Sequence, residues 1–451
     1  MANRSRRDVG RFLKEPNASL SAVASTMCDR GPFLTSVTSF TRLVSFYQTA
    51  NPFERLEERD DTDGDGRGFS RRSSARSAAA STPPGPIGSF PHEQTEPDSR
   101  ERSSALNNDR PVRIGLMGYG FGGRFFHAPL IASSSRCDFV GVVTTSSERK
   151  DLVSREHPST PTFTSLAALR EAGAEAVTIS TPAHTHSSLT DEALRLGLAV
   201  VCDKPFAMEA TSAKATVQLA DELGLVLSPY QNRRWDSDFL TVRKLAADGS
   251  LGEITRFESR FERFAPQEGP PTAGGGTLLD FCSHLVDQSL VLLGPAASVY
   301  AELRTRESGL DDDVFLAITH ESGGRSHLWG SWRQAAPGPR FRVTGTEGAF
   351  VLTAGDTQED VLVAGDTPAS RAADWGVEPE PNWGVLSRGA DRVRVPSASG
   401  QWQTYYPAFA DAVQGLGPVP VNPQDAVATA TVLDAAALSA RSGAVVNIEP
   451  V

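Results

Sequence analysis

Three side chains of this 451-residue sequence have the chemistry for proton transfer at a hydroxyl group. Lys204 follows an apolar run and precedes a proline, which would hold its ammonium rigidly where it can stabilise alkoxide charge. Asp280 and His284 are four residues apart after a run of glycines, so we expect both on one helical face. Histidine, with a free pKa near about 6.5, can take and return a proton. Lys204 and His284 are therefore predicted to be catalytic, and Asp280 to bind substrate, although each pattern alone also fits an ordinary surface residue.

A glycine turn would place a second reactant beside these groups. Gly118, Gly120 and Gly123 fit the pattern G-x-G-x-x-G and follow an apolar strand that begins at Val112. The first glycine allows the tight turn, the second lets a pyrophosphate approach, and the third lets helix and strand pack closely. The predicted dinucleotide site consists of Gly118, Gly120, Phe121, Gly122 and Gly123.

The end of the second expected strand, 137–144, bears on the choice of cofactor. An acidic residue there would bind the adenosine ribose 2′-hydroxyl of NAD. This chain instead carries Ser146, Ser147 and Arg149, and hydroxyls with a cation suit a 2′-phosphate. The acidic residue Glu148 lies between Ser147 and Arg149, and we interpret it as a residue of a helix N-terminus. NADP is therefore predicted, with NAD as the alternative.

Two further segments are expected at the same edge of the sheet. Thr181, Pro182 and His186 follow the expected strand 176–180, so they should face the cofactor, as should Lys204. Arg233 and Trp235 lie where the chain crosses into its second half. They could bind substrate hydroxyls or could tie the two halves together, and the sequence leaves both interpretations open.

The order of elements predicts two domains behind a polar extension. Strands and helices alternate over 110–232, which predicts an α/β Rossmann domain with a parallel sheet. Short alternating stretches within 253–352 and helices at 238–247, 406–413 and 424–440 predict a C-terminal α+β domain with an open, mainly antiparallel sheet over 233–451. Residues 1–109 are polar, with a tract rich in Ser, Arg and Pro, and are predicted to be disordered.

Composition argues against several other kinds of protein. The net charge of −11 disfavours nonspecific nucleic-acid binding, and no apolar run is long enough for a membrane span. The four cysteines are far apart, and no third ligand accompanies Asp280 and His284 at metal spacing, so no metal site is predicted. A cytoplasmic location is expected from this cysteine usage.

Over residues 110–448 the chain resembles the Gfo/Idh/MocA oxidoreductases in the order of three motifs. These are the glycine turn, Lys204-Pro205, and the glycine run before Asp280 and His284. Three further segments are similar to the branch that contains NADP-dependent scyllo-inositol dehydrogenases: 126–131, 232–239 and 374–376. The resemblance implies the same catalytic roles for Lys204 and His284, a substrate-holding role for Asp280, and a homo-oligomer formed through the C-terminal sheet. The chain departs from the family pattern at Asp203, usually glutamate, and at Cys282, often glycine.

Together these features predict reversible hydride transfer between a hydroxyl of a cyclic polyol or sugar, such as scyllo-inositol, and NADP. Two alternatives remain on the same fold. One is an NAD(P)-dependent glycosidase that recycles its cofactor, and the other is a cofactor-sensing regulator without turnover. The expected partner is a small polyol or sugar, with no nucleic acid and no membrane.

Overall fold

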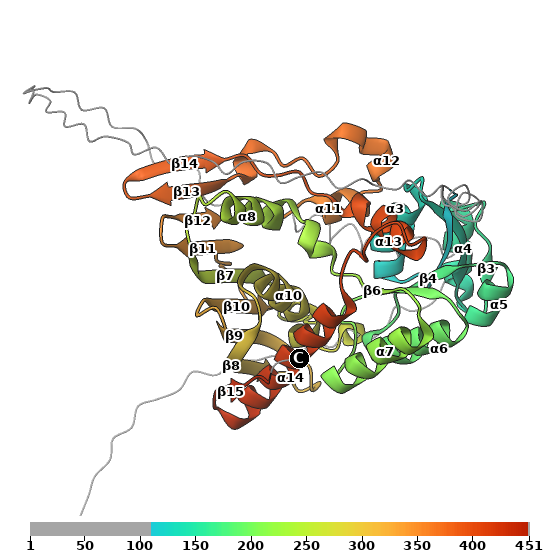
Figure 1. The fold of residues 1–451 in the computed structure, drawn as a ribbon, viewed down its shortest axis with the longest axis horizontal. Helices are drawn as coiled ribbons and strands as arrows, with labels where there is room; N and C mark the ends of the chain where they lie inside the picture. The colour runs from blue at the N-terminus through green and yellow to red at the C-terminus, as the bar shows by residue number, and fades with distance from the viewer. Residues whose placement is uncertain (1–109, 450–451) are drawn as a thin grey trace, which may run out of the picture. The chain divides into compact units, whose positions relative to one another are not determined.

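The computed structural model describes residues 110–449, which form a six-stranded and a nine-stranded sheet with their helices (Figure 1). The disorder predicted for residues 1–109 concerns residues outside this range. No helix within 110–449 has the length and apolar character needed to cross a membrane.

The six-stranded sheet is parallel throughout and has the order β3-β2-β1-β4-β5-β6. Its strands are β1 Val112–Met117, β2 Cys137–Val143, β3 Thr162–Phe163, β4 Ala176–Ile179, β5 Ala199–Cys202 and β6 Leu227–Pro229. Strands β4 and β5 are buried at every residue, as expected for parallel strands covered on both faces. The strand order reverses between β1 and β4, the point beyond which such sheets bind ligands. The predicted Rossmann sheet is confirmed.

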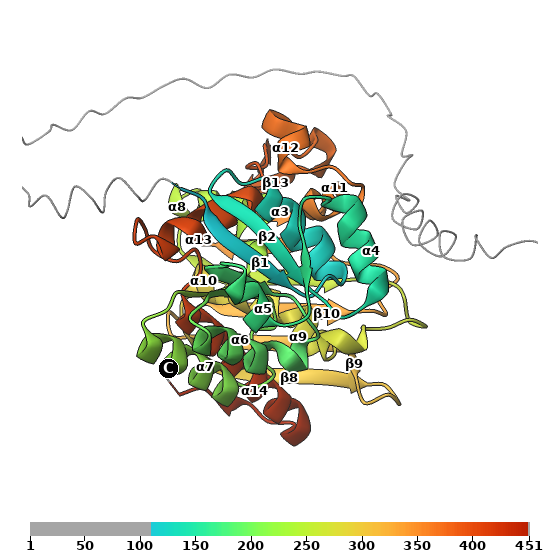
Figure 2. The same ribbon diagram turned by 90° about the vertical axis from the view of Figure 1, so that its right-hand side faces the viewer.

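Helices cover both faces of this sheet (Figure 2). The elements between its strands are η1 Gly122–His127, α3 Ala128–Ala132, α4 Ser147–Glu156, α5 Leu166–Glu171, η2 Ala183–Thr185, α6 His186–Arg195, α7 Ala210–Leu223 and, after β6, η3 Asn232–Trp235. One apolar cluster joins the sheet to α5, α6, α7 and the start of α14, Pro423–Ser442. The other joins it to α3 and to α13, Tyr405–Val413, whose residues Tyr405, Tyr406 and Phe409 are fully buried. Residues from the end of the chain therefore complete the core of its first half.

The nine-stranded sheet has the order β14-β13-β12-β11-β7-β10-β9-β8-β15. Its strands are β7 Ile254–Glu262, β8 Ala296–Thr305, β9 Asp311–His320, β10 Arg325–Ser331, β11 Phe341–Gly345, β12 Ala349–Leu352, β13 Gly384–Arg388, β14 Asp391–Val395 and β15 Val446–Asn447. All pairs are antiparallel except β7 with β10. The predicted open, mainly antiparallel sheet is confirmed, while the parallel pair and the β13–β14 hairpin were not predicted.

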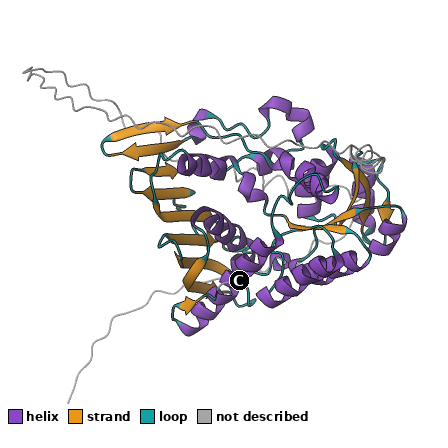
Figure 3. Cartoon of the chain, viewed as in Figure 1, coloured by secondary structure: helices purple, strands orange, loops and turns teal. Residues whose placement is uncertain are grey.

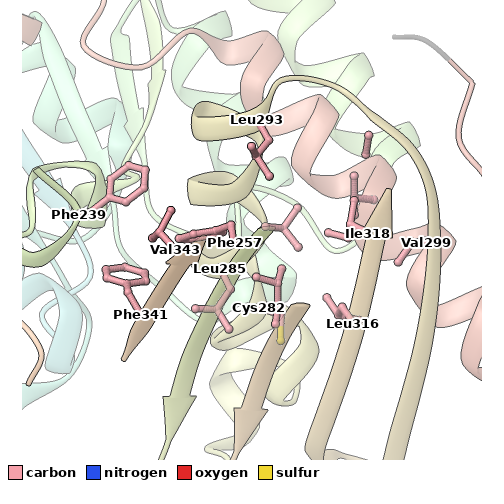
Figure 4. Close-up of a cluster of buried hydrophobic side chains, with 14 of the residues drawn as sticks. Phe239, Phe257, Cys282, Leu285, Leu293, Val299, Leu316, Ile318, Phe341 and Val343 are labelled. Carbon is pink, nitrogen blue, oxygen red and sulfur yellow. The ribbon is translucent and has the colours of Figure 1, made fainter. Parts of the chain in front are cut away.

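Helices lie on one face of this second sheet, and within residues 110–449 none lies on the other (Figure 3). The remaining helical elements are α8 Ser237–Ala247, η4 Thr272–Gly274, α9 Thr277–Asp280, α10 Cys282–Leu293, α11 Gln358–Val363, α12 Pro368–Arg371, η5 Ala372–Asp374, η6 Glu380–Asn382 and η7 Trp402–Thr404. The core between sheet and helices contains Phe239 of α8, Leu285 of α10, and Leu316 and Phe341 of the strands (Figure 4). Their packing fixes α10, which carries His284, against the sheet.

Candidate active site

The glycine turn after β1 is packed too closely for side chains at two of its glycines. Gly118 has a φ of +97°, and a Cβ there would lie 2.1 Å from the carbonyl oxygen of Ser180. A Cβ on Gly123 would lie 2.2 Å from the oxygen of Gly118. At Gly122 it would meet Ser180 Oγ at 2.8 Å and Asp203 Oδ2 at 3.0 Å, so the turn lies against the ends of β4 and β5. This backbone cradle, kept free of side chains, fits the phosphates of a dinucleotide.

The residues predicted to choose the cofactor lie beside this turn. The guanidinium of Arg149 lies 4.0 Å from the position that a Cβ on Gly120 would take, and the side chain is exposed. Ser146 caps α4, its hydroxyl accepting a hydrogen bond from the backbone N–H of Arg149 at 3.3 Å, and Ser147 begins the helix. Phe121, directly before η1, is 51% exposed. Arg149 is thus placed where it could reach a phosphate at the adenosine end.

His186 lies behind the turn that carries Lys204. Its side chain is buried, with Nδ1 2.7 Å from the carbonyl oxygen of Pro205 and Nε2 2.8 Å from that of Thr181. Pro182 is exposed beside it. Because both ring nitrogens face backbone carbonyls, His186 braces the segments that carry Thr181 and Lys204, and its contact with a cofactor stays a prediction.

Lys204 reaches from the first sheet to the helices of the second. It directly follows β5 and Asp203, and its bond to Pro205 is cis. The ammonium donates to Oδ1 of Asp280 at the end of α9. The backbone N–H of Lys204 donates to Oδ1 of Asp203 at 2.8 Å. The lysine and the predicted substrate-binding carboxylate are therefore in direct contact.

His284 is buried and is held neutral within range of the Lys204 charge. It is 4% exposed, and burial together with the charges of Lys204, Arg233 and Arg340 lowers its pKa well below the usual value. Its Nδ1 lies 3.2 Å from Oε1 of Gln231. When Nδ1 donates to this amide oxygen, the lone pair is on Nε2, as a proton-accepting base requires.

The expectation of one helix carrying Asp280 and His284 is wrong. Helix α9 ends at Asp280 and α10 begins at Cys282, with Phe281 between them. The ring of Phe281 stacks between Phe261 at 4.4 Å and Trp332 at 5.1 Å, and this packing accompanies the break. Asp280 contacts Lys204 while His284 contacts Gln231, so the two residues have different partners.

Arg233 and Trp235 are held by neighbouring residues. Arg233 is paired with Asp236 at 3.2 Å and with Glu359 at 2.7 Å. The ring of Trp235 packs edge-on against Tyr405, at 5.7 Å between centroids. The adjacent Arg234 pairs with Asp287 at 2.5 Å and with Asp425 at 2.9 Å. These contacts tie the crossing segment to the second half, and substrate contacts of Arg233 and Trp235 stay predictions.

A buried chain of polar groups supports the carboxylate that precedes Lys204. His127 is fully buried, with Nδ1 2.7 Å from the hydroxyl of Tyr406, which in turn lies 3.1 Å from Thr178 Oγ1. Its Nε2 lies 3.1 Å from Asp203 Oδ2. Burial raises the pKa of Asp203, but the charges of His127, His186 and Lys204 together outweigh burial, and the pKa falls below its usual range.

Sequence reasoning did not single out Gln231, Glu359 and His127, although each contacts a residue of the candidate site or its neighbour. A signal existed for Gln231, because it follows the carboxyl end of β6, where ligands bind in parallel sheets. Glu359 lies on α11, in a segment without any recognisable motif. Within residues 110–449, no group of three or more His, Cys, Asp or Glu side chains is arranged to hold a metal ion.

Comparisons with known proteins bear on the family of this chain. Residues 112–231 match the model of the oxidoreductase family with an NAD-binding Rossmann fold, and residues 239–351 match the GFO/IDH/MocA C-terminal domain. The uncharacterized oxidoreductase YdgJ of Escherichia coli is 37% identical over 329 residues, covering 70% of this chain and 92% of YdgJ. The scyllo-inositol 2-dehydrogenase (NADP(+)) IolW of Bacillus subtilis is 30% identical over 352 residues, covering 75% of this chain and 96% of IolW.

A solved structure shares the fold over the same region. An oxidoreductase from Bacillus cereus superimposes with a TM-score of 0.69 at 26% identity, covering 75% of this chain and 99% of that chain. The matched regions include the glycine turn, Lys204 and His284. The chain therefore belongs to the Gfo/Idh/MocA family of oxidoreductases.

Proposed function

We propose that the protein is an NADP-dependent dehydrogenase that reversibly oxidises a ring hydroxyl of a cyclic polyol or sugar, with scyllo-inositol as the leading candidate. The main support is the ion pair between Lys204, at the carboxyl end of β5, and Asp280, with the neutral His284 close enough for the Lys204 charge to lower its pKa. The similarity to IolW supports the choice of substrate.

A nicotinamide dinucleotide held by the glycine turn of Gly118, Gly120 and Gly123 would supply the hydride acceptor. His284 Nε2 takes the proton of the reacting hydroxyl, because Nδ1 is held by Gln231 and the imidazole is uncharged. The Lys204 ammonium stabilises negative charge on the same oxygen. Asp280 holds the ammonium in place and has a second oxygen free to accept from a neighbouring substrate hydroxyl.

NADP is proposed over NAD because Arg149 lies beside the glycine turn and Ser146 ends the loop that precedes α4.

We also propose that the protein forms a homo-oligomer through the uncovered face of the nine-stranded sheet. This face carries a cluster of Phe315, His327 and Trp329, with the Arg260 guanidinium 3.9 Å from the Trp329 ring centre. Light scattering coupled to gel filtration, with Trp329→Glu as the disrupting variant, tests this proposal.

We propose a cytoplasmic location, which the free cysteines Cys137, Cys202 and Cys282 support.

The test of function is a screen of inositols and aldoses with NADP and NAD in parallel, followed by the absorbance of the reduced nicotinamide. We expect net NADPH formation with a neutral cyclic polyol and loss of about 10²–10⁴ in rate for His284→Ala. Release of free sugar without net NADPH would support a glycosidase instead. Tight NADPH binding without turnover of any substrate would support a regulator.

A further inference from the structure

We propose that Glu359 makes this site selective for neutral polyhydroxylated substrates. Its carboxylate would accept hydrogen bonds from substrate hydroxyls and would repel substrates that carry a carboxylate or phosphate. The inference rests on the proposed function, because it assumes that the pocket of Lys204 and His284 binds the substrate.

Two arginines orient the Glu359 carboxylate without using all of its acceptor capacity. Oε2 lies 2.7 Å from Arg233 Nη2, and Oε1 lies 3.7 Å from Arg263 Nη2, beyond hydrogen-bond distance. The Glu359 side chain is 23% exposed and that of Arg263 is 29% exposed. An ionised carboxylate can accept about four hydrogen bonds, so acceptor sites remain for a ligand.

Both arginines stand next to the catalytic segments. The Arg263 guanidinium lies 5.4 Å from the ring centre of Phe281, the residue that follows Asp280. Arg233 lies two residues after Gln231, the partner of His284, and its carbonyl oxygen accepts from Gln288 Nε2 at 2.9 Å. Glu359 therefore lies near the segments that carry Asp280 and His284, through its contacts with Arg233 and Arg263.

Glu359 is ionised in the folded protein. Burial raises its pKa, but the charges of Arg233, Arg263 and Lys204 outweigh burial and lower the pKa below the usual value. Lys204 acts on Glu359 as well as on His284, so one ammonium links both groups electrostatically.

The helix that carries Glu359 is fixed before any ligand binds. The preceding residue, Gln358, is buried, and its amide nitrogen donates to the carbonyl oxygen of Trp235 at 3.2 Å. Its amide oxygen accepts from the backbone N–H of Trp402 at 2.9 Å. These bonds hold the start of α11 against η3 and η7, so the carboxylate is preorganised as a specificity group should be.

The experiment compares Glu359→Gln with Glu359→Asp, which keeps the charge, and with Glu380→Gln, an exposed control in the same inter-strand segment. For each, kcat and KM are measured for scyllo-inositol and glucuronate. Glu359→Gln is expected to raise KM for scyllo-inositol about 10-fold or more, with kcat within about 3-fold, because hydrogen bonds to a charged acceptor are lost. The preference for the neutral substrate, measured as the ratio of kcat/KM for scyllo-inositol to kcat/KM for glucuronate, should fall at least about 10-fold, because the repulsion of the acid is removed. Glu359→Asp should retain this preference, and Glu380→Gln should match the wild type.

An unchanged preference in Glu359→Gln, or a wild type that already prefers glucuronate, would overturn the inference and leave the dehydrogenase proposal standing. A wild type that turns over no polyol would count against the proposed function instead. In that case, thermal shifts of the NADPH complex with each ligand still decide the role of Glu359. Greater stabilisation of the wild type by scyllo-inositol than by glucuronate, with the order reversed in Glu359→Gln, would support the role of Glu359. Equal shifts with the two ligands would reject that role.

Discussion

Replacing Gln231 by glutamate is expected to raise the pKa of His284 and to move the acid limb of the activity profile to higher pH. The amide oxygen that faces His284 Nδ1 at 3.2 Å would become a carboxylate oxygen. Lys204, Arg233 and Arg340, whose charges now lower the pKa of His284, would keep the new carboxylate ionised. The change therefore adds one negative charge next to the imidazole of His284.

The size of the shift follows from the distance. Two unit charges at 3.2 Å attract by about 1.3 kcal/mol at the dielectric constant of water and by about 5 kcal/mol at an effective value near 20. At about 1.4 kcal/mol per pKa unit, this gives about one to four units. Desolvation of the new carboxylate opposes the gain, so we expect the lower half of this range, about one to two units.

The assay is kcat/KM for polyol oxidation between about pH 5 and 9, which reports the base of the free enzyme. The acid limb should lie below about pH 6.5 in the wild type and higher in Gln231→Glu. Gln231→Leu is the control, since it removes the hydrogen bond without adding charge. NMR titration of isotope-labelled histidines, with His284→Asn for assignment, follows the same pKa without turnover. An acid limb that stays in place or moves to lower pH in Gln231→Glu would refute the reasoning.

Four further predictions concern stability and cofactor binding. The folded pKa of His284 lies below its unfolded value, so its contribution to stability is present above about pH 6.5 and is lost as pH falls toward the folded pKa. The urea concentration at the unfolding midpoint should therefore be lower at about pH 5.5 than at about pH 7.5. This decrease should be smaller in His284→Asn. Gly118→Ala, with a Cβ 2.1 Å from a backbone oxygen and a φ of +97°, should destabilise the fold by about 2 kcal/mol or more in urea unfolding. Gly120→Ala, whose Cβ meets a flexible guanidinium at 4.0 Å, should leave the urea midpoint nearly unchanged but weaken NADP binding in a fluorescence titration. Arg149→Ala should lower NADP affinity about 10- to 100-fold and leave NAD affinity nearly unchanged, as titration with both cofactors would show.

The parts of the structure that local sequence determines were predicted well. The glycine spacing after an apolar strand requires a tight turn, and the turn has the expected positive φ at Gly118. Lys204 was expected at the cofactor edge because the carboxyl ends of parallel strands share one edge, and it follows β5 at that edge. Alternation of apolar residues likewise located β9 and β12, whose inward residues are buried.

The parts that depend on distant contacts were not predicted. His284 meets Gln231 from 53 residues away, and no spacing rule encodes that distance. The break at Phe281 accompanies stacking with Phe261 and Trp332, which come from other segments of the C-terminal half. Glu359 lies on a short helix whose first turn is fixed by Gln358, and neither residue belongs to a periodic pattern. Pairing of β7 with β10 in parallel is similarly a property of the assembled sheet.

The position of α13 bears on how the protein is made. Tyr406 bonds to His127 across 279 residues of sequence, and Tyr405 and Phe409 fill the same face of the first sheet. A nascent chain that has just emerged from the ribosome up to β6 would expose this apolar face, because its cover has not yet been translated. The cofactor-binding sheet thus reaches its native packing only near the end of synthesis, and a premature stop before Trp402 would leave it uncovered for chaperones and proteases.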